Sequence, residues 1–407
     1  MSLYSLKLAQ GCMQPWAQEV HLAASGAGCD GLFSLYNSLG DKTLIGTNNV
    51  GTLLDGPEKV IRYGALTLGD GTTPTSLTAS SRCKGLTILC DSLMVKANAT
   101  MHMTGRGARV WSGDDLFFPF IDYRIPFKVV LASSRITFPQ AMAIITEQGF
   151  APWDQGTWQH SVAALYGFNL SVSLVGSVNL LSASGGGSGG AQSVMGTGVG
   201  GNGGASGGMG GGGSGGSNTI GAGSYWAARG GFGCPYSGGS GSGACFANSG
   251  YDGYTMEGAP LQSKFSGPGG RGGMLWHSNN SSVDSQLAGF GCGGAGNPGG
   301  LGTPGVNSNP GNDGTGGKLT IICRGPITVQ SGGRIEANGI PGGSGANNAV
   351  GGGGSGGGHV SIISPASPAN SGTIQAAGGA GGTGNYGNGG AGGAGSVVTK
   401  TFGDMGW

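Results

Sequence analysis

Residues 319–329 read LTIICRGPITV, and related phrases occur at residues 86–95 (LTILCDSLMV) and 170–180 (LSVSLVGSVNL). Each phrase alternates leucine or β-branched residues with small polar residues, which is the period-two pattern of a β-strand. Each is followed by a second short strand-like run and then by glycine. Repeats of this kind bury their apolar faces only by stacking on one another. The sequence therefore predicts a mainly β fold, organised as a β-helix-like ladder of short repeated strands.

Two later segments extend the ladder and show where the glycine belongs. Residues 330–343 read QSGGRIEANGIPGG, and residues 359–382 read HVSIISPASPANSGTIQAAGGAGG. In both, a strand-like run ends in a step of small residues, from which a glycine run departs. We therefore expect the glycine runs to be long excursions whose two ends are fixed by strands, including the run GGASGGMGGGGSGGSNTIGAG at residues 203–223.

The composition divides the chain into two regions that differ in glycine content. Only 19 of the 96 glycines precede Gly185, and the total of 17 prolines without a Gly-X-Y period excludes collagen. Charged residues make up 9% and hydrophobic residues 37%, which is not the balance of ordinary disorder. The glycine runs are consistent either with polyglycine II-like helices packed side by side or with flexible linkers. Their interleaving with aromatic and aliphatic residues favours an ordered array.

We expect four regions along the chain. Residues 1–60 are a less repetitive opening, residues 61–105 hold the first β-repeat, and residues 168–407 form the glycine-rich repeat domain. Residues 106–167 are predicted to be a small α+β insert, because FFPFIDYRIPFKVV is strand-like and aromatic and FPQAMAIITEQG is typical of one short helix. The N-terminus has no signal-peptide pattern and no run is long enough to span a bilayer. Synthesis in the cytoplasm is therefore expected.

The patterns that carry common enzymatic chemistry are weak. GNDGTGGKLT resembles a phosphate loop, but Leu319 occupies the required hydroxyl position, and no cofactor or metal is predicted. Asp114, Asp115 and Asp122 are the one acidic cluster that a glycan-cleaving enzyme would use, and an exposed turn is the simpler interpretation. The eight cysteines are expected to be mostly free buried thiols, and a bond between Cys234 and Cys245 is left open. The net charge of +1 argues against nucleic-acid binding.

An aromatic stretch on a Gly/Ser/Asn background, residues 225–276, is the candidate binding region. Such a composition is typical of binding loops, in which Tyr and Trp supply contact area. Packing of these aromatics inside the array or between subunits is the alternative. The candidate residues are Tyr225, Trp226, Phe232, Tyr236, Phe246, Tyr251, Tyr254, Phe265 and Trp276.

The order of these phrases resembles the glycine-rich tail-fibre and tail-tip proteins of bacteriophages and prophages. It runs from PTSLTASSRCKGLTILCDSLMV through GGKLTIICRGPITVQSGGRIEANGIPGG to GGGGSGGGHVSIISPASPANSGTIQAAGGAGG, covering roughly residues 66–105 and 168–403. The composition is also similar to tail-fibre adhesins of T-even-like phages, whose glycine stretches pack as a polyglycine II sandwich and whose loops touch the host receptor.

The resemblance implies a non-enzymatic virion protein that recognises a bacterial surface receptor, either an outer-membrane protein or a glycan. It also implies a homotrimer and attachment to other virion proteins through residues 1–60. Two alternatives remain: a particle-decoration protein without a receptor, and a glycan depolymerase spike.

Overall fold

Parallel β-strands dominate the structure, a computed structural model in which residues 33–34, 36–109, 192–193, 230–231, 233, 237–243, 245–246, 290–302, 308–346, 349–385 and 387–405 are described. Three five-stranded sheets make up the body of the fold, and a short helix α8 (Phe402–Met405) ends the described chain. The prediction of a mainly β fold is confirmed. Within the described residues no helix is long and apolar enough to cross a membrane.

Sheet 1 contains, in spatial order, β1 (Lys42–Leu44), β4 (Ala65–Leu68), β7 (Ser92–Val95), β13 (Ile327–Val329) and β17 (Ala369–Asn370). Sheet 2 contains β2 (Thr47–Val50), β5 (Thr75–Ala79), β8 (Ala99–His102), β14 (Arg334–Glu336) and β18 (Thr373–Gln375). Sheet 3 contains β3 (Lys59–Arg62), β6 (Leu86–Cys90), β12 (Lys318–Cys323), β16 (His359–Ser364) and β19 (Ser396–Thr401).

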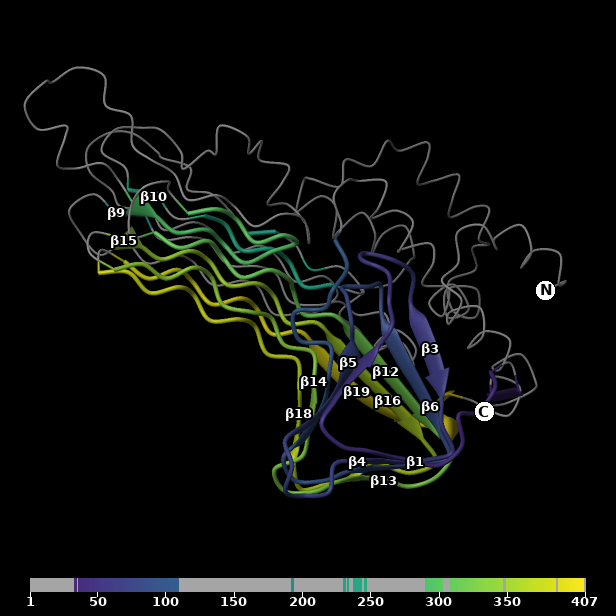
Figure 1. Cartoon of the computed structure of the whole chain (residues 1–407). Coiled ribbons are helices and arrows are strands. Elements are labelled where there is room, and N and C mark those ends of the chain that lie inside the picture. The colour runs from purple at the N-terminus through teal and green to yellow at the C-terminus, as the bar shows by residue number, and fades with distance from the viewer. Residues whose placement is uncertain are drawn as a thin grey trace, which may run out of the picture.

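The chain visits the three sheets in a fixed order. Strands β1, β2 and β3 form the first circuit, and each later circuit again adds one strand to sheet 1, then sheet 2, then sheet 3. Every pairing between neighbouring strands of these sheets is parallel, beginning with the pairing of β1 with β4. The three sheets thus face one another around a shared interior (Figure 1).

The repeated phrases occupy equivalent places in successive circuits, as the sequence predicts. Leu86 to Cys90 pair one-to-one with Leu319 to Cys323, and Leu93 to Val95 pair with Ile327 to Val329. The related phrase at residues 170–180 lies outside the described residues.

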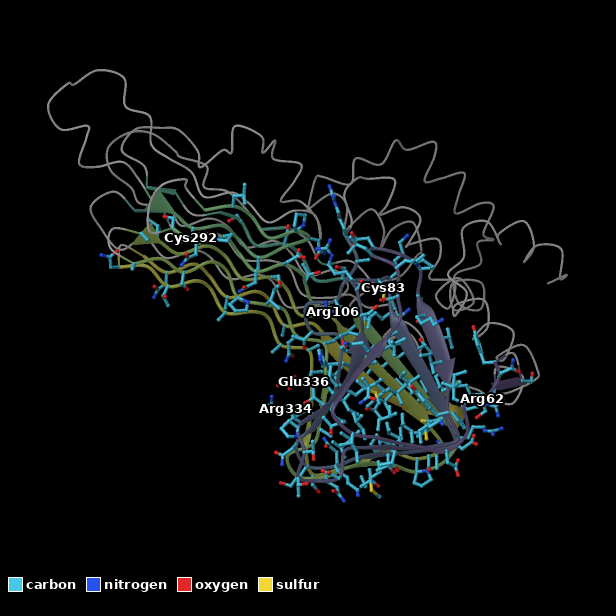
Figure 2. All side chains as sticks on the ribbon, viewed as in Figure 1. Arg62, Cys83, Arg106, Cys292, Arg334 and Glu336 are labelled. Carbon is cyan, nitrogen blue, oxygen red and sulfur yellow. The ribbon has the colours of Figure 1, made fainter. Side chains whose placement is uncertain are left out.

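Stacked aliphatic side chains fill the interior (Figure 2). Ile88, Ile321 and Ile362 occupy one register position on three neighbouring strands and are fully buried, and Ile61 extends the row on β3. Burying one such side chain stabilises the fold by about 1.5–3 kcal/mol. Because strand side chains alternate, the residues between these positions lie on the outer face of sheet 3.

Three interruptions of the circuits contain the glycine-rich sequence. Residues 103–317 separate β8 from β12, residues 337–358 separate β14 from β16, and residues 376–395 separate β18 from β19. All three lie between a strand of sheet 2 and the next strand of sheet 3, so the excursions leave the body along one edge (Figure 1). The expectation that strands fix both ends of the glycine runs is confirmed for the runs within 337–358 and 376–395.

The first circuit begins at Lys42, inside the range 1–60 that the sequence separates from the repeats. Its strands β1 and β2 are too polar for the pattern to stand out, since Thr47 to Asn49 offer no aliphatic alternation. Almost all of the expected α+β insert, including its predicted helix, lies outside the described residues.

Candidate functional site

The glycine segments pack into an array whose hydrogen bonds recur at every third residue. Segment 337–346 donates from every third amide to segment 376–385, at 2.8–3.0 Å. The three donors are Gly339, Gly342 and Gly345, and their acceptors are the carbonyls of Ala377, Ala380 and Thr383. A period of three residues is the repeat of an extended threefold helix and differs from the period of two in a β-strand.

Segment 349–358 lies at the centre of the array and is buried along its whole length. Its successive amides point to different neighbours: Gly351 donates to Gly387, Gly352 to Gly343, and Gly353 to Ser242. These bonds measure 2.9, 3.0 and 2.9 Å. Residues 351–358 are therefore held from three sides, and their amide groups are hydrogen-bonded without forming a sheet.

Close approach of the backbones explains why these positions are glycine. A Cβ added at Gly358, Gly381 or Gly382 would overlap the carbonyl oxygen of the neighbouring segment, well under 3.0 Å away. The clashing atoms belong to the backbone, which cannot relieve the overlap by changing a side-chain rotamer. In segment 387–395, larger residues occupy the outward-facing positions. Asn388, Ala391 and Ala394 are exposed there, whereas the glycines one place before each of them are buried.

The base of the array meets sheet 3 in a row of polar residues. Lys318 and His359 begin β12 and β16 and lie in register, and Ser396 continues the row on β19. Glu58 and Gly85 precede β3 and β6 by one residue and complete the row, since Lys59 and Leu319 both pair with Leu86. Each of the last three strands in this row is entered directly from a glycine segment, so the row marks the boundary between body and array.

The side chains of Glu58, Lys318 and His359 in this row are buried, that of Ser396 is half-buried, and all four form hydrogen bonds. Lys318 Nζ donates to Glu58 Oε2 at 2.7 Å, and both side chains are completely buried. The Thr87 hydroxyl donates to the other carboxylate oxygen, Oε1. The His359 ring contacts the Ser396 hydroxyl through Nδ1 and the Ser361 hydroxyl through Nε2.

Burial controls the protonation of the row. Loss of solvation raises the pKa of Glu58 to about 7, against the opposing effect of Lys318, and lowers the pKa of Lys318 to about 8. Burial together with the Lys318 charge lowers the pKa of His359 to about 3, so the imidazole is neutral. Burial also raises the pKa of the nearby Cys83 thiol to about 11. None of these shifts produces a nucleophilic thiolate or a charged histidine.

An ion-pair network joins the base of the array to the second circuit. Arg82, which is buried, pairs with Asp55 at 3.2 Å and also with Asp313 of the glycine segment 308–317. Gly107 donates to Thr315 in the same segment at 2.9 Å. The array is therefore attached through side chains and backbone as well as through its covalent connections.

The distal end of the array carries two short parallel strand pairs. Strand β9 (Gln192–Ser193) pairs with β10 (Cys245–Phe246), and β11 (Phe290–Gly291) pairs with β15 (Ala349–Val350). They lie at the end remote from the three sheets (Figure 1). At the base, Ser237 forms a bridge with Gly317. Nine residue steps separate Ser237 from Phe246, which corresponds to about 28 Å of extended chain at about 3.1 Å per residue.

Among the predicted aromatic candidates, the structure describes only Phe246, whose backbone lies in the distal strand β10. Tyr225, Trp226, Phe232, Tyr236, Tyr251, Tyr254, Phe265 and Trp276 lie outside the described residues. Their connections nevertheless divide them into two groups. The distal group, Tyr251, Tyr254, Phe265 and Trp276, belongs to residues 247–289, which leave from β10 and return to β11. The proximal group, Tyr225, Trp226, Phe232 and Tyr236, is named for its position in the sequence shortly before Ser237.

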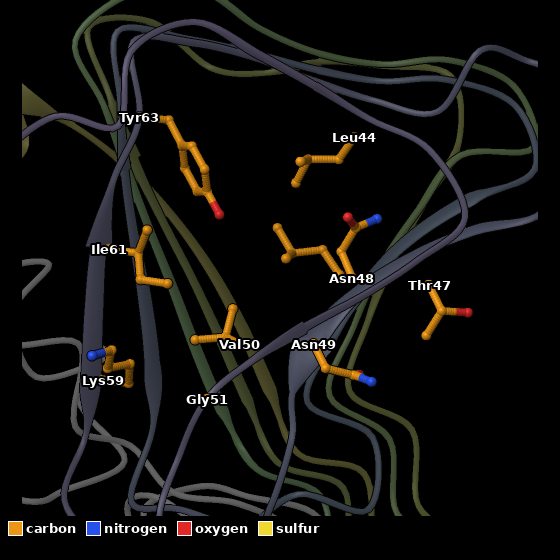
Figure 3. A pocket seen from close by; sticks show the side chains of 10 residues that line it. Leu44, Thr47, Asn48, Asn49, Val50, Gly51, Lys59, Ile61 and Tyr63 are labelled. Carbon is orange, nitrogen blue, oxygen red and sulfur yellow. The ribbon is translucent and has the colours of Figure 1, made fainter.

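A cavity of about 560 Å³ opens at the first-circuit end of the body (Figure 3). Its lining includes the apolar side chains of Leu44, Val50, Ile61 and Leu77 and the polar side chains of Asn48 and Lys59. Among the described residues, no carboxylate lines it. The described lining therefore lacks the paired acids that glycan cleavage requires.

Other predicted features fall partly within the described residues. Cys83, Cys90, Cys292 and Cys323 are free and buried, as expected. Cys234 and the cluster of Asp114, Asp115 and Asp122 lie outside the described part of the chain. No group of three metal-binding side chains occurs among the described residues. The Glu58–Lys318 pair is absent from the sequence predictions, and its one signal is a lysine at the start of an otherwise apolar strand, KLTIIC.

Comparison with known proteins identifies no relative. No protein-family model matches the chain, and no curated protein or solved structure matches it.

Proposed function

We propose that the chain is a non-enzymatic adhesive component of a phage particle, a tail fibre or tail-tip protein that binds a bacterial surface receptor. In this proposal the three-sheet body is a β-helix, and the glycine segments form a polyglycine II-type array that projects from it. The circuits through three parallel sheets and the three-residue hydrogen-bond period support these two assignments.

The observation that carries the proposal is where residues 247–289 join the described chain. Residues 247–289 are joined at both ends to strands at the far end of the array, about 28 Å of extended chain from the base. The intervening segments are hydrogen-bonded from several sides, so the array resists bending. In this proposal the aromatic-rich residues 247–289 form the tip of this projection, and their Tyr and Trp side chains contact the receptor.

The proposal also covers how the protein attaches to the particle and how its subunits assemble. Residues 1–60 would join other virion proteins, because the chain enters the body at the end opposite the last circuit. The expected assembly is a homotrimer. One chain supplies all three sheets, so subunits would associate as complete bodies without exchanging strands.

Adsorption of purified protein to host cells tests the receptor role. Replacing the distal group with serine (Tyr251, Tyr254, Phe265 and Trp276) is expected to reduce cell binding at least tenfold. The same replacement of the proximal group (Tyr225, Trp226, Phe232 and Tyr236) is the matched control and should leave binding within about twofold, since hot-spot aromatics dominate interface energies.

Circular dichroism and thermal melting establish that both variants remain folded. Undiminished binding by a folded distal-group variant would refute the receptor assignment. Retention of that variant on particles, with normal adsorption, would then favour a decoration protein.

A further inference from the structure

Lys318 and Glu58 meet over a glycine that lies between them. They come from β12 and from the residue before β3, and β6 separates these strands in sheet 3. Gly85, immediately before β6, occupies the intervening place in the row. A Cβ there would stand 3.1 Å from Glu58 Cδ and 3.2 Å from Lys318 Cε. The absence of a side chain at Gly85 is what allows the amine and the carboxyl group to touch across a neighbouring strand.

We propose that Lys318 and Glu58 condense to an intramolecular isopeptide cross-link with loss of one water molecule. Nζ lies 2.7 Å from Oε2, and a carbon–oxygen bond adds about 1.2 Å, so Nζ is at most about 4 Å from Cδ. Holding an amine this close to a carboxyl carbon supplies the proximity that makes an intramolecular reaction fast.

The reaction balances without any co-reactant. One proton passes from the Lys318 ammonium to Oε2, which gives a free amine beside a neutral carboxylic acid. Nζ attacks Cδ, the new N–C bond forms, and a second amine proton moves to Oε2. The bond from Cδ to Oε2 then breaks and water leaves. Oε1, which accepts the Thr87 hydrogen bond, carries the developing negative charge and becomes the amide oxygen.

The environment lowers the free-energy cost of the neutral pair that this reaction needs. Both side chains are completely buried, and desolvation penalises their charged forms. The pKa of Glu58 rises to about 7 and that of Lys318 falls to about 8, so proton transfer between them costs far less than it does in water. A desolvated lysine with a lowered pKa is an established form of activated nucleophile.

The cross-link would join residues 260 positions apart in the sequence. It would tie the first circuit to the strand that follows the 103–317 excursion, at the base of the array. The inference stands independently of the proposed function, because it concerns only the chemistry of this buried pair.

High-resolution mass spectrometry of the denatured, reduced full-length chain tests the proposal. The expected mass is below the sequence mass by one water, about 18 Da, as amide formation requires. Trypsin should fail to cut after Lys318 and should yield one branched product, with residues 43–59 joined to residues 272–324. A full sequence mass with separate peptides would overturn the proposal.

Lys318→Arg is the matched variant, because arginine keeps the charge and cannot form this amide. It should show the full sequence mass and no branched peptide. Succinimide formation at an Asp–Gly step also removes one water, but it joins no peptides and would persist in Lys318→Arg. A mass deficit that persists in this variant would therefore refute the cross-link. If Lys318→Arg does not fold, the branched peptide of the native sequence decides the question alone.

Discussion

Replacing Gly352 with alanine should disrupt the centre of the glycine array. Gly352 donates to Gly343 at 3.0 Å and accepts from Gly382 at 2.8 Å. Its added Cβ would overlap the Gly293 carbonyl oxygen and come within 2.5 Å of Gly293 carbon, where ordinary contact begins at 3.4 Å. Segment 290–297 must therefore retreat by at least about 0.9 Å, the difference between these two distances.

The cost follows from the bonds that such a retreat breaks. Cys292 donates to Val350 and Ala295 donates to Gly353, both at 2.9 Å, and adding the retreat carries them to about 3.8 Å, beyond hydrogen-bond length. Losing two bonds costs about 2 kcal/mol and overpacking adds about 1–3 kcal/mol. Alanine offsets about 0.5–1 kcal/mol of this cost, because it loses less backbone conformational freedom on folding than glycine does. The net destabilisation is about 2–4 kcal/mol.

Hydrogen exchange of the amides in segment 349–358 measures this local effect. A loss of about 2–4 kcal/mol in opening free energy accelerates exchange about 30- to 1,000-fold. Gly51→Ala is the control, because a Cβ at Gly51 meets nothing within 4 Å and its φ is not left-handed. That change should be neutral or slightly stabilising. Exchange in Gly352→Ala within twofold of the unsubstituted protein would refute the close-packing argument.

Three further predictions concern protonation, thiol access and the array surface. His359 has its pKa lowered to about 3, so the unfolded chain binds this proton first, and the contribution of His359 to stability should fall by about 1.4 kcal/mol per pH unit below 6.5. Glu58, with its pKa raised to about 7, acts in the opposite direction over the same range. Denaturant melts of the unsubstituted protein and of His359→Gln from pH 7 to 4 should differ by this slope, because the Glu58 effect is common to both. Cys83, with its pKa raised to about 11, should resist iodoacetamide at pH 8 in the folded protein, as mass spectrometry reports, and react once unfolded. Ala391→Lys, at an exposed place, should shift stability by less than about 0.5 kcal/mol in the same melts.

The stacked circuits were predictable because their repeats are nearly identical. A ladder places the same residue above itself, so Leu86 over Leu319 and Ile88 over Ile321 follow from aligning the two phrases. The first circuit escaped the pattern since the residues of β2, TNNV, show no apolar alternation. Its place depends on pairing with β5, a long-range contact that local sequence does not encode.

The points where the glycine excursions leave the body were predictable from the sequence, but the side-chain contacts at their base were not. Small-residue steps after Ile335 and Ile374 correctly located the points where glycine segments leave the body. The Glu58–Lys318 pair was not predictable. It requires two residues 260 positions apart and a gap provided by Gly85 on a third strand, and all three become neighbours only when the circuits stack.

At the base of the array, the two-residue period of the β-strands gives way to the three-residue period of the glycine segments. This junction fixes the register of each glycine segment. Ser396 must pair with His359 in sheet 3, while residues 387–395 must present every third residue outward. Inserting one glycine before Gly395 would move this segment one place toward the tip. Asn388, Ala391 and Ala394 would then occupy the places of the buried glycines whose carbonyls bind the amides of Gly351, Gly354 and Gly357.

Three Cβ atoms would enter closely packed positions together, each at a cost of about 1–3 kcal/mol, so the segment should detach. An insertion of three glycines restores the threefold phase and should preserve the contacts, although it adds more flexible residues. Hydrogen exchange across residues 349–358 distinguishes the two variants. Equal protection after one-residue and three-residue insertions would show that the array has no threefold register, because chain length alone would then set the outcome.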